Sequence, residues 1–223
     1  MVRQQLKSSI ISYCVIWGIA ALLLLSCNQK PKTLPFFNSA EFSPEWISDD
    51  DAKFDAIHKI ADFSFIDQNN QKVTNANFDG RLYVANFFFT TCPGICPQMT
   101  NNMAKLQDHY MDDDRIKFLS HSVTPWMDTV KQLRRYAKAN GVVSKKWHLV
   151  TGDKEVIYNI ARQSYFAEKQ IGLQLDSDDF LHTENFLLVD HERRIRGIYN
   201  GTIDSEMERL MEDIDILFSN ENL

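Results

Sequence analysis

Two cysteines, Cys92 and Cys96, are the residues of this chain with the clearest capacity for chemistry. They lie four positions apart, after the apolar run 82–89 (LYVANFFF) and before a helical pattern that begins near Pro97. At such a strand-to-helix turn both sulfurs can lie on one side of the first helical turn, where the helix dipole favours thiolate over thiol. Paired thiolates suit Cu(I), and in an oxidising compartment they can close into a disulfide. The pair therefore predicts a metal site or a redox site.

The spacing of the pair argues against several familiar kinds of thiol protein. A thioredoxin-type motif has two residues between its cysteines, whereas this chain has the three residues Pro-Gly-Ile. A peroxiredoxin would have Thr three positions before the nucleophile, and this chain has Phe89 there. A structural disulfide that closes so short a loop would restrain little of the unfolded chain.

The N-terminus has the pattern of a lipoprotein signal peptide. Residues 1–9 carry Arg3 and Lys7 without an acid, residues 10–25 are almost wholly apolar, and the run ends in Leu-Leu-Ser followed by Cys27, which looks like a bacterial lipobox. We expect a signal peptide over 1–26, a lipidated Cys27, a tether and arm over 27–57, and a folded domain over 58–223. The alternative is an uncleaved anchor, but about 16 apolar residues are short for a bilayer span. Either alternative predicts a membrane-attached protein outside the cytoplasm.

Composition excludes several classes of protein. The 223 residues include 24 Lys and Arg against 30 Asp and Glu, for a net charge of −6. No basic stripe is expected, and this balance argues against a partner that is a nucleic acid. With 44% hydrophobic and 24% charged residues, the chain is typical of a globular protein rather than a disordered one.

The periodicity predicts an α/β fold. The first expected element is a hairpin at 63–66 and 73. Strands at 82–89, 116–123 and 147–150 then alternate with helices at 97–110, 130–139 and after Asp153. A hairpin at 185–190 and 194–199 and a helix at 204–218 follow. This order matches a thioredoxin-like sandwich with an added N-terminal β-hairpin. Met99 and Met103 are expected in the core, and Phe36, Phe37, Phe42 and Trp46 are expected to dock on the domain surface.

Several segments together resemble the SCO/SenC family of copper proteins over residues 58–218. They are FFFTTCPGICPQMTNNMAKLQ, SVTPWMD at 122–128, LVTGD at 149–153 and DDFLHTENFLLVD. The resemblance implies a thioredoxin-like fold that holds one copper, as Cu(I) or Cu(II), through Cys92, Cys96 and His182. His121, at the end of an expected strand, is the one rival histidine. The chain has Gly94 and Thr124 where family members often have Asp, and it keeps Asp128.

The expected function is that of a membrane-tethered copper metallochaperone, and the sequence leaves open whether the protein is also an enzyme. The resemblance implies a role in maturing the dinuclear copper site of cytochrome c oxidase. The expected partners are the copper-bearing oxidase subunit, a copper donor protein and the membrane, through the lipid anchor. The alternatives are a thiol–disulfide oxidoreductase with Cys92 and Cys96 as its catalytic dithiol, and a copper or redox sensor.

Overall fold

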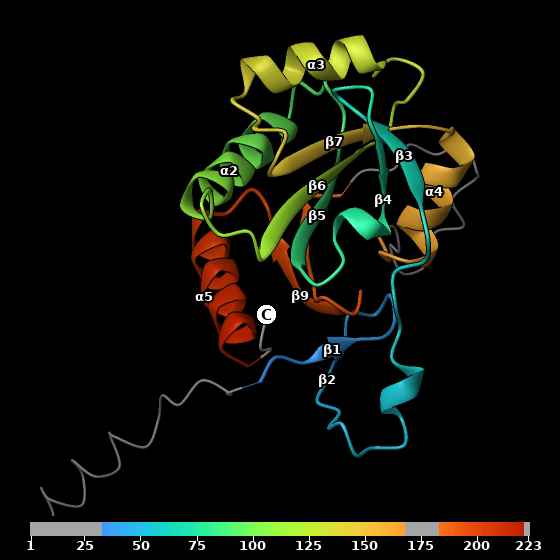
Figure 1. Cartoon of the computed structure of the whole chain (residues 1–223), viewed down its shortest axis with the longest axis vertical. Coiled ribbons are helices and arrows are strands. Elements are labelled where there is room, and N and C mark those ends of the chain that lie inside the picture. The colour runs from blue at the N-terminus through green and yellow to red at the C-terminus, as the bar shows by residue number, and fades with distance from the viewer. Residues whose placement is uncertain (1–32, 168–182, 221–223) are drawn as a thin grey trace, which may run out of the picture. The chain divides into compact units, whose positions relative to one another are not determined.

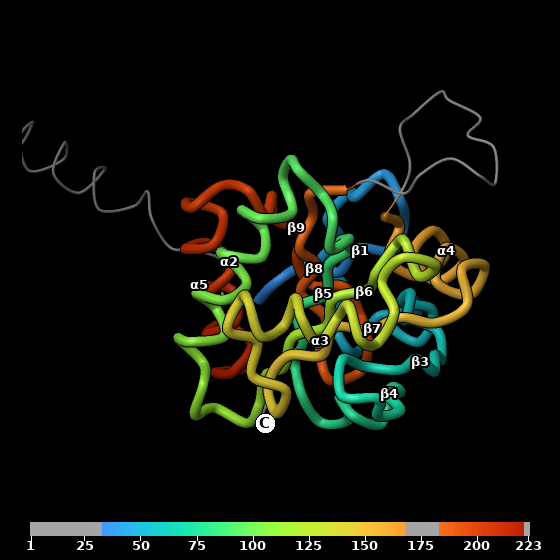
Figure 2. Tube along the Cα trace, turned by 90° about the horizontal axis from the view of Figure 1, so that it is seen from above, coloured from blue at the N-terminus to red at the C-terminus, as the bar shows by residue number. Residues whose placement is uncertain are grey.

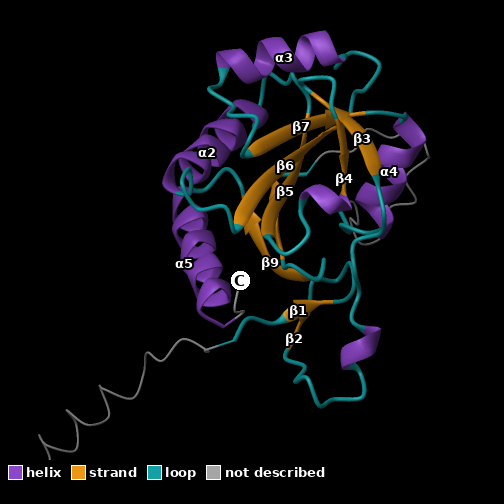
Figure 3. Cartoon of the chain, in the orientation of Figure 1, coloured by secondary structure: helices purple, strands orange, loops and turns teal. Residues whose placement is uncertain are grey.

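The computed structural model describes residues 33–167 and 183–220, which form an α/β domain around a mixed seven-stranded sheet (Figures 1 and 3). In spatial order the strands are β4 (Lys72–Thr74), β3 (Ser64–Asp67), β7 (Trp147–Thr151), β6 (Ile116–Ser122), β5 (Leu82–Phe88), β8 (Asn185–Val189) and β9 (Ile195–Asn200). The three central strands β7, β6 and β5 are parallel, and the flanking strands on both sides are antiparallel. The expected α/β, thioredoxin-like fold class is confirmed.

Helices cover both faces of the sheet. The helices of the described domain are α2 (Cys96–His109), α3 (Val130–Ala139), α4 (Lys154–Gln163) and α5 (Asp204–Asn220), with short 3₁₀ turns η1 (Phe54–Ala56) and η2 (Asn75–Asn77). Apolar residues of α2, α3 and α5 share one core with one face of the sheet, and those of α4 share a second core with the other face. Figure 2 shows α2 and α5 on one side of the strands and α4 on the other. All seven residues of β5 are buried because this strand lies between the two cores.

The parallel strands position the cysteine turn. β5 pairs in register with β6 from Leu82 opposite Ile116 to Phe88 opposite Ser122, so the carboxyl ends of both strands reach the same edge of the sheet. The chain leaves β5, passes through residues 89–95 and enters α2 at Cys96. Met99 and Met103 of α2 are fully buried, which confirms that they are core residues.

The segment before the sheet contains a second, separate hairpin. Strands β1 (Phe36–Phe37) and β2 (Pro44–Glu45) pair with each other, and Phe36 is buried beneath the guanidinium of Arg196, whose Cζ is 4.2 Å from the ring centroid. Docking is therefore confirmed for Phe36. The prediction was wrong for Trp46, because 60% of its surface is exposed.

His121 is an ionisable residue in an apolar environment. It lies two residues after Leu119 on β6, so both side chains are on the same face of the sheet and face the core that contains α4. Its ring stacks on Phe87 at 5.1 Å and also contacts Phe65 and Tyr165, both at 5.4 Å. Neither ring nitrogen has a hydrogen-bond partner among the described residues. Complete burial lowers the pKa of the imidazole from 6.5 to about 3, so His121 is neutral in the folded protein.

We predict that His121 makes the fold sensitive to acid. Between pH 6.5 and about 3 the unfolded chain binds a proton at this residue that the folded chain does not bind, so the free energy of unfolding falls as the pH falls. The His121→Leu variant should lose this contribution, on the order of 1 kcal/mol per pH unit within that window. Urea unfolding at several pH values measures it, with the exposed His109→Gln as control. Parallel pH profiles for wild type and His121→Leu would contradict it.

Candidate functional site

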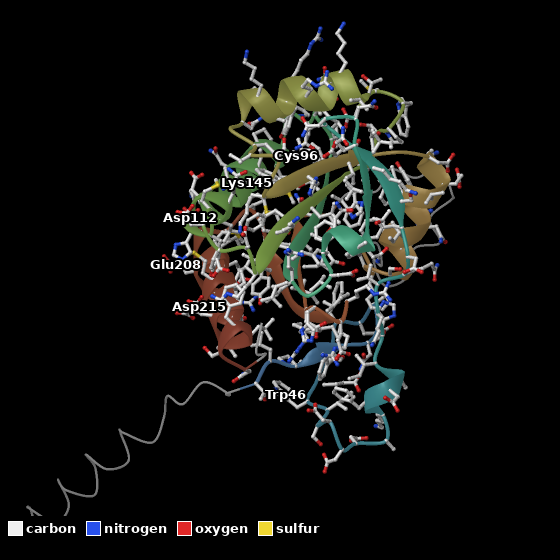
Figure 4. All side chains as sticks on the ribbon, in the orientation of Figure 1. Trp46, Cys96, Asp112, Lys145, Glu208 and Asp215 are labelled. Atoms are coloured by element: carbon white, nitrogen blue, oxygen red, sulfur yellow. The ribbon has the colours of Figure 1, made fainter. Side chains whose placement is uncertain are left out.

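The two thiols lie at the start of α2, at different depths. Cys96 is the first residue of the helix and is 3% exposed, whereas Cys92 is partly exposed in the preceding turn. Both are free thiols. In Figure 4, Cys96 lies at the end of α2 beneath α3. The turn between them, Pro93–Gly94, is exposed, so a reactant can reach Cys92 without a change in the fold.

The surroundings separate the acidities of the two thiols. Partial burial opposes ionisation of Cys92, but hydrogen bonds from the Cys96 thiol and from the amides of Gly94, Ile95 and Cys96 outweigh it and lower the pKa of Cys92. Burial raises the pKa of the Cys96 thiol to about 12, and the nearby Cys92 and Asp128 also raise it. The outer thiol is therefore the more acidic of the two, and the inner thiol donates a hydrogen bond to it.

A buried carboxylate, Asp128, fixes the chain that leads into the turn. Thr90, two residues before Cys92, donates its backbone N–H to Oδ2 at 3.2 Å and its hydroxyl to Oδ1 at 2.5 Å. Ser122 and Thr124 donate their hydroxyls to Oδ2 at 2.6 and 3.0 Å. These donors satisfy a carboxylate that is 0% exposed, which offsets the cost of its burial.

Helix α3 packs directly against this turn. Gln132 Nε2 donates to the Thr90 hydroxyl at 3.0 Å. The Tyr136 hydroxyl lies 2.6 Å from that of Thr100 in α2. Burial raises the pKa of Tyr136, although its hydrogen bond with Thr100 lowers it. The ring packs against the same core as Cys92 and Cys96. The first two turns of α3 thus border the site.

The described residues supply two of the three expected metal ligands. His182 lies outside the described residues, and within them no cluster of three His, Cys, Asp or Glu side chains has the arrangement of a metal site. The rival ligand His121 faces the opposite side of the sheet from Cys96, because the two belong to different cores. His58 and His148 are engaged elsewhere, with Ser164 O at 2.8 Å and Asp67 Oδ2 at 3.1 Å.

The donor set is compatible with two kinds of chemistry. Two adjacent sulfurs on one turn fit a soft cation such as Cu(I), which displaces their protons when it binds. The same sulfurs fit thiol–disulfide exchange, in which the more acidic and exposed thiol attacks first.

Sequence reasoning missed the hydroxyl donors around Asp128. Thr90 follows β5, and Ser122 ends β6, so both lie at the carboxyl edge of the parallel strands. Polar residues after adjacent parallel strands meet at such an edge, and that pattern was the available signal.

Comparison with known proteins identifies the family to which this fold and dithiol turn belong. The family model described as SCO1/SenC matches residues 52–218. A Bacillus subtilis protein named SCO1 protein homolog is 28% identical over 161 residues, which span 70% of this chain and 81% of that protein. The thioredoxin-like fold and its paired thiols define the class of protein. The chain belongs to the SCO1/SenC family.

Solved structures agree with this assignment. A SCO1/SenC family lipoprotein from Bacillus anthracis matches with a TM-score of 0.62 at 26% identity, over 71% of this chain and 94% of that one. BsSco, described as a Sco-family cytochrome c oxidase assembly protein with a disulfide switch, matches with a TM-score of 0.61 at 27% identity, over 71% and 92%. Copper-bound ScoI of Arabidopsis thaliana matches with a TM-score of 0.56 at 27% identity, over 70% and 97%.

We predict that Asp128→Asn destabilises the domain by about 2–4 kcal/mol, because an amide nitrogen cannot accept the donors that converge on the lost oxygen. Thermal and urea unfolding measure the change. Asp112→Asn is the matched control, because Asp112 is exposed. Equal stability of the Asp128 and Asp112 variants would show that the hydrogen bonds to Asp128 do not support the fold.

Proposed function

We propose that this protein is a membrane-tethered copper metallochaperone that binds one copper through Cys92, Cys96 and His182 and assists maturation of the dinuclear copper site of cytochrome c oxidase. The observation that carries the proposal is the pair of free, hydrogen-bonded thiols on one turn. Membership of the SCO1/SenC family adds weight, because an Arabidopsis relative has been solved with copper bound and BsSco is described as belonging to a family of oxidase assembly proteins.

The two thiols have different parts in copper binding. Cys92 is the first ligand, because it is partly exposed and is the more acidic of the two thiols. Cys96 binds only after it loses its proton, so the metal replaces a proton in the core. His182 is the third ligand, and its imidazole suits Cu(II) as well as Cu(I). A site that accepts both oxidation states can receive and release the metal.

The copper ligands are open to a direct test. Cys92→Ser and Cys96→Ser should each lower the Cu(I) affinity of the reduced protein by at least about a hundredfold, because one soft thiolate is lost. Anaerobic titration against a competing chelator measures it, with the exposed neighbour Thr91→Ala as control. Wild-type affinity in either serine variant would reject the dithiol copper site.

The membrane tether is the second part of the proposal. Cys27 and the signal peptide lie outside the described residues, and no helix of the described part is long and apolar enough to cross a bilayer. The lipobox-like sequence supports the tether, and the B. anthracis relative is described as a lipoprotein.

Mass spectrometry of the membrane fraction should show a mature chain that begins at a lipidated Cys27. In Cys27→Ala the lipid should be absent and the signal uncleaved. An intact Met1 terminus on the wild-type protein, or an unmodified Cys27, would contradict the prediction.

A thiol–disulfide oxidoreductase is the second candidate function. The specific observation in its favour is the combination of an exposed Cys92 with lowered pKa and an inner Cys96 positioned to resolve a mixed disulfide. Such an activity would keep the copper-site cysteines of the oxidase reduced. The disulfide switch described for BsSco is compatible with it.

His182→Ala separates the two functions, because it leaves both thiols in place. For a copper chaperone we expect loss of oxidase activity in cells, partly restored by added copper, while the purified variant still exchanges with disulfides. His109→Ala, an exposed histidine in α2, is the control. Full oxidase assembly in a well-expressed His182→Ala strain without added copper would favour the oxidoreductase.

A further inference from the structure

The charges of this acidic protein are unevenly distributed. Residues 115–152 contain eight Lys or Arg and one acid, Asp128, whereas the rest of the chain contains 16 basic and 29 acidic residues. That single acid is buried and occupied by hydrogen bonds. Arg115 is paired with Asp113, just outside this stretch, and Lys146 is buried, so much of the exposed positive charge lies on α3, beside the thiols. The expectation that the chain has no basic stripe was wrong.

Helix α3 carries four of these eight basic residues and presents them to solvent. Leu133 and Ala137 are buried and Tyr136 is half-buried, so one side of the helix faces the core and the other side faces solvent. Its exposed cations are Lys131, Arg134, Arg135 and Lys138. None of these four forms an ion pair with any described residue, although Arg134 donates to the carbonyl of Gln68. Figure 4 shows long side chains with nitrogen at their ends that project from α3 away from the sheet.

The loop before α3 adds an apolar surface. Trp126 and Met127 are 57% and 50% exposed. Five large apolar side chains are exposed in the described domain, and these two are adjacent in the sequence. Lys154 Nζ lies 5.7 Å from the centre of the Trp126 ring. Aromatic and methionine side chains are enriched in protein interfaces, where they supply much of the binding energy.

This loop and helix are bonded to the cysteine turn. Asp128 directly follows Met127 and accepts from Thr90, and Gln132 of α3 donates to the same threonine. A partner seated on the loop and on the first turns of α3 therefore lies beside Cys92. We name Trp126, Met127 and the four exposed cations of α3 the α3 surface.

We propose that the α3 surface is the docking site for a protein that has an acidic surface around its own metal-binding or thiol site. The proposal rests on the proposed function, because it concerns the partner that exchanges copper or electrons with Cys92 and Cys96. Unpaired cations attract an acidic surface, and Trp126 and Met127 are buried on contact. The acidic residues of α5, among them Glu208 and Asp215 in Figure 4, repel the same partner and so orient its approach.

The chemistry of the site favours a protein over a lipid bilayer. An anionic membrane would also attract α3, but it would cover the thiols with a surface that has no ligand for a soft cation. A protein that carries thiolates or imidazoles beside acidic residues can both dock and receive the metal.

The test uses the copper-free full-length protein in nanodiscs of zwitterionic lipid. The probe is the soluble copper-site domain of the oxidase subunit from the same organism, and the dissociation constant is measured at low and high salt. The variant K131E/R135E removes two cations of the α3 surface. The control K53E/K59E makes the same change of charge at and near η1, at the opposite end of the domain in Figure 1. The Lys59–Glu192 pair lost in the control is exposed and contributes little.

We expect wild-type binding to weaken with salt, and K131E/R135E to bind at least about tenfold more weakly and with less salt dependence. The control should remain within about twofold of wild type, and Trp126→Ala should weaken binding without changing the salt dependence. Circular dichroism verifies that K131E/R135E folds. We expect it to fold, because position 131 is in the first turn of α3, where the helix dipole favours an acidic side chain. K131Q/R135Q replaces the variant if it does not fold.

Equal effects of the two charge-reversal pairs would overturn the proposal. So would the absence of wild-type binding, or binding of the protein to phosphatidylglycerol vesicles through Lys131 and Arg135 but not to the oxidase domain. Separately, the Cu(I) affinities of wild type and K131E/R135E should be equal. If wild type fails to bind Cu(I), the metallochaperone proposal fails, whereas the docking result, measured without copper, is still valid.

Discussion

The carboxylate of Asp128 is the constraint on which the arrangement of the site depends. It is buried at the carboxyl edge of the central strands and accepts hydrogen bonds from Thr90, Ser122 and Thr124. These residues belong to the segment after β5, the end of β6 and the loop before α3. A buried carboxylate is costly without such donors, so the segment after β5 and the stretch 122–128 are fixed at one point. The position of Thr90, two residues before Cys92, is therefore fixed by hydrogen bonds to Asp128, which is distant in the sequence.

This fixed entry gives the two thiols unlike environments. Cys96 begins α2 and lies in the core, whereas Cys92 lies among exposed residues and accepts from backbone amides. Burial raises the pKa of both thiols, and only at Cys92 do the hydrogen bonds from the Cys96 thiol and from backbone amides outweigh it. In the function we propose, the outer thiol meets the incoming metal or disulfide and the inner thiol completes the reaction.

The proposed docking surface lies next to the segment that is hydrogen-bonded to the cysteine turn. Trp126 and Met127 are exposed immediately before the buried Asp128, and the exposed cations of α3 begin three residues later. In the proposed docking, a partner that presses on this loop contacts the element that is hydrogen-bonded to the cysteine turn. The net charge of the whole chain is negative and therefore does not indicate this local positive surface.

The sequence by itself determined the strands of the seven-stranded sheet, the helices α2 to α5 and the class of chemistry, but not the hairpin of β1 and β2. Strands and helices followed from the spacing of apolar residues, and two thiols four apart at a strand-to-helix turn limited the site to soft-metal binding or redox exchange. Tertiary structure alone decided that His121 faces the core opposite Cys96, because alternation along a strand separates two faces without saying which helices cover each. It also decided that Phe36 is buried and Trp46 exposed, and that the donors to Asp128 converge. Those outcomes depend on contacts between segments distant in sequence, which no local pattern records.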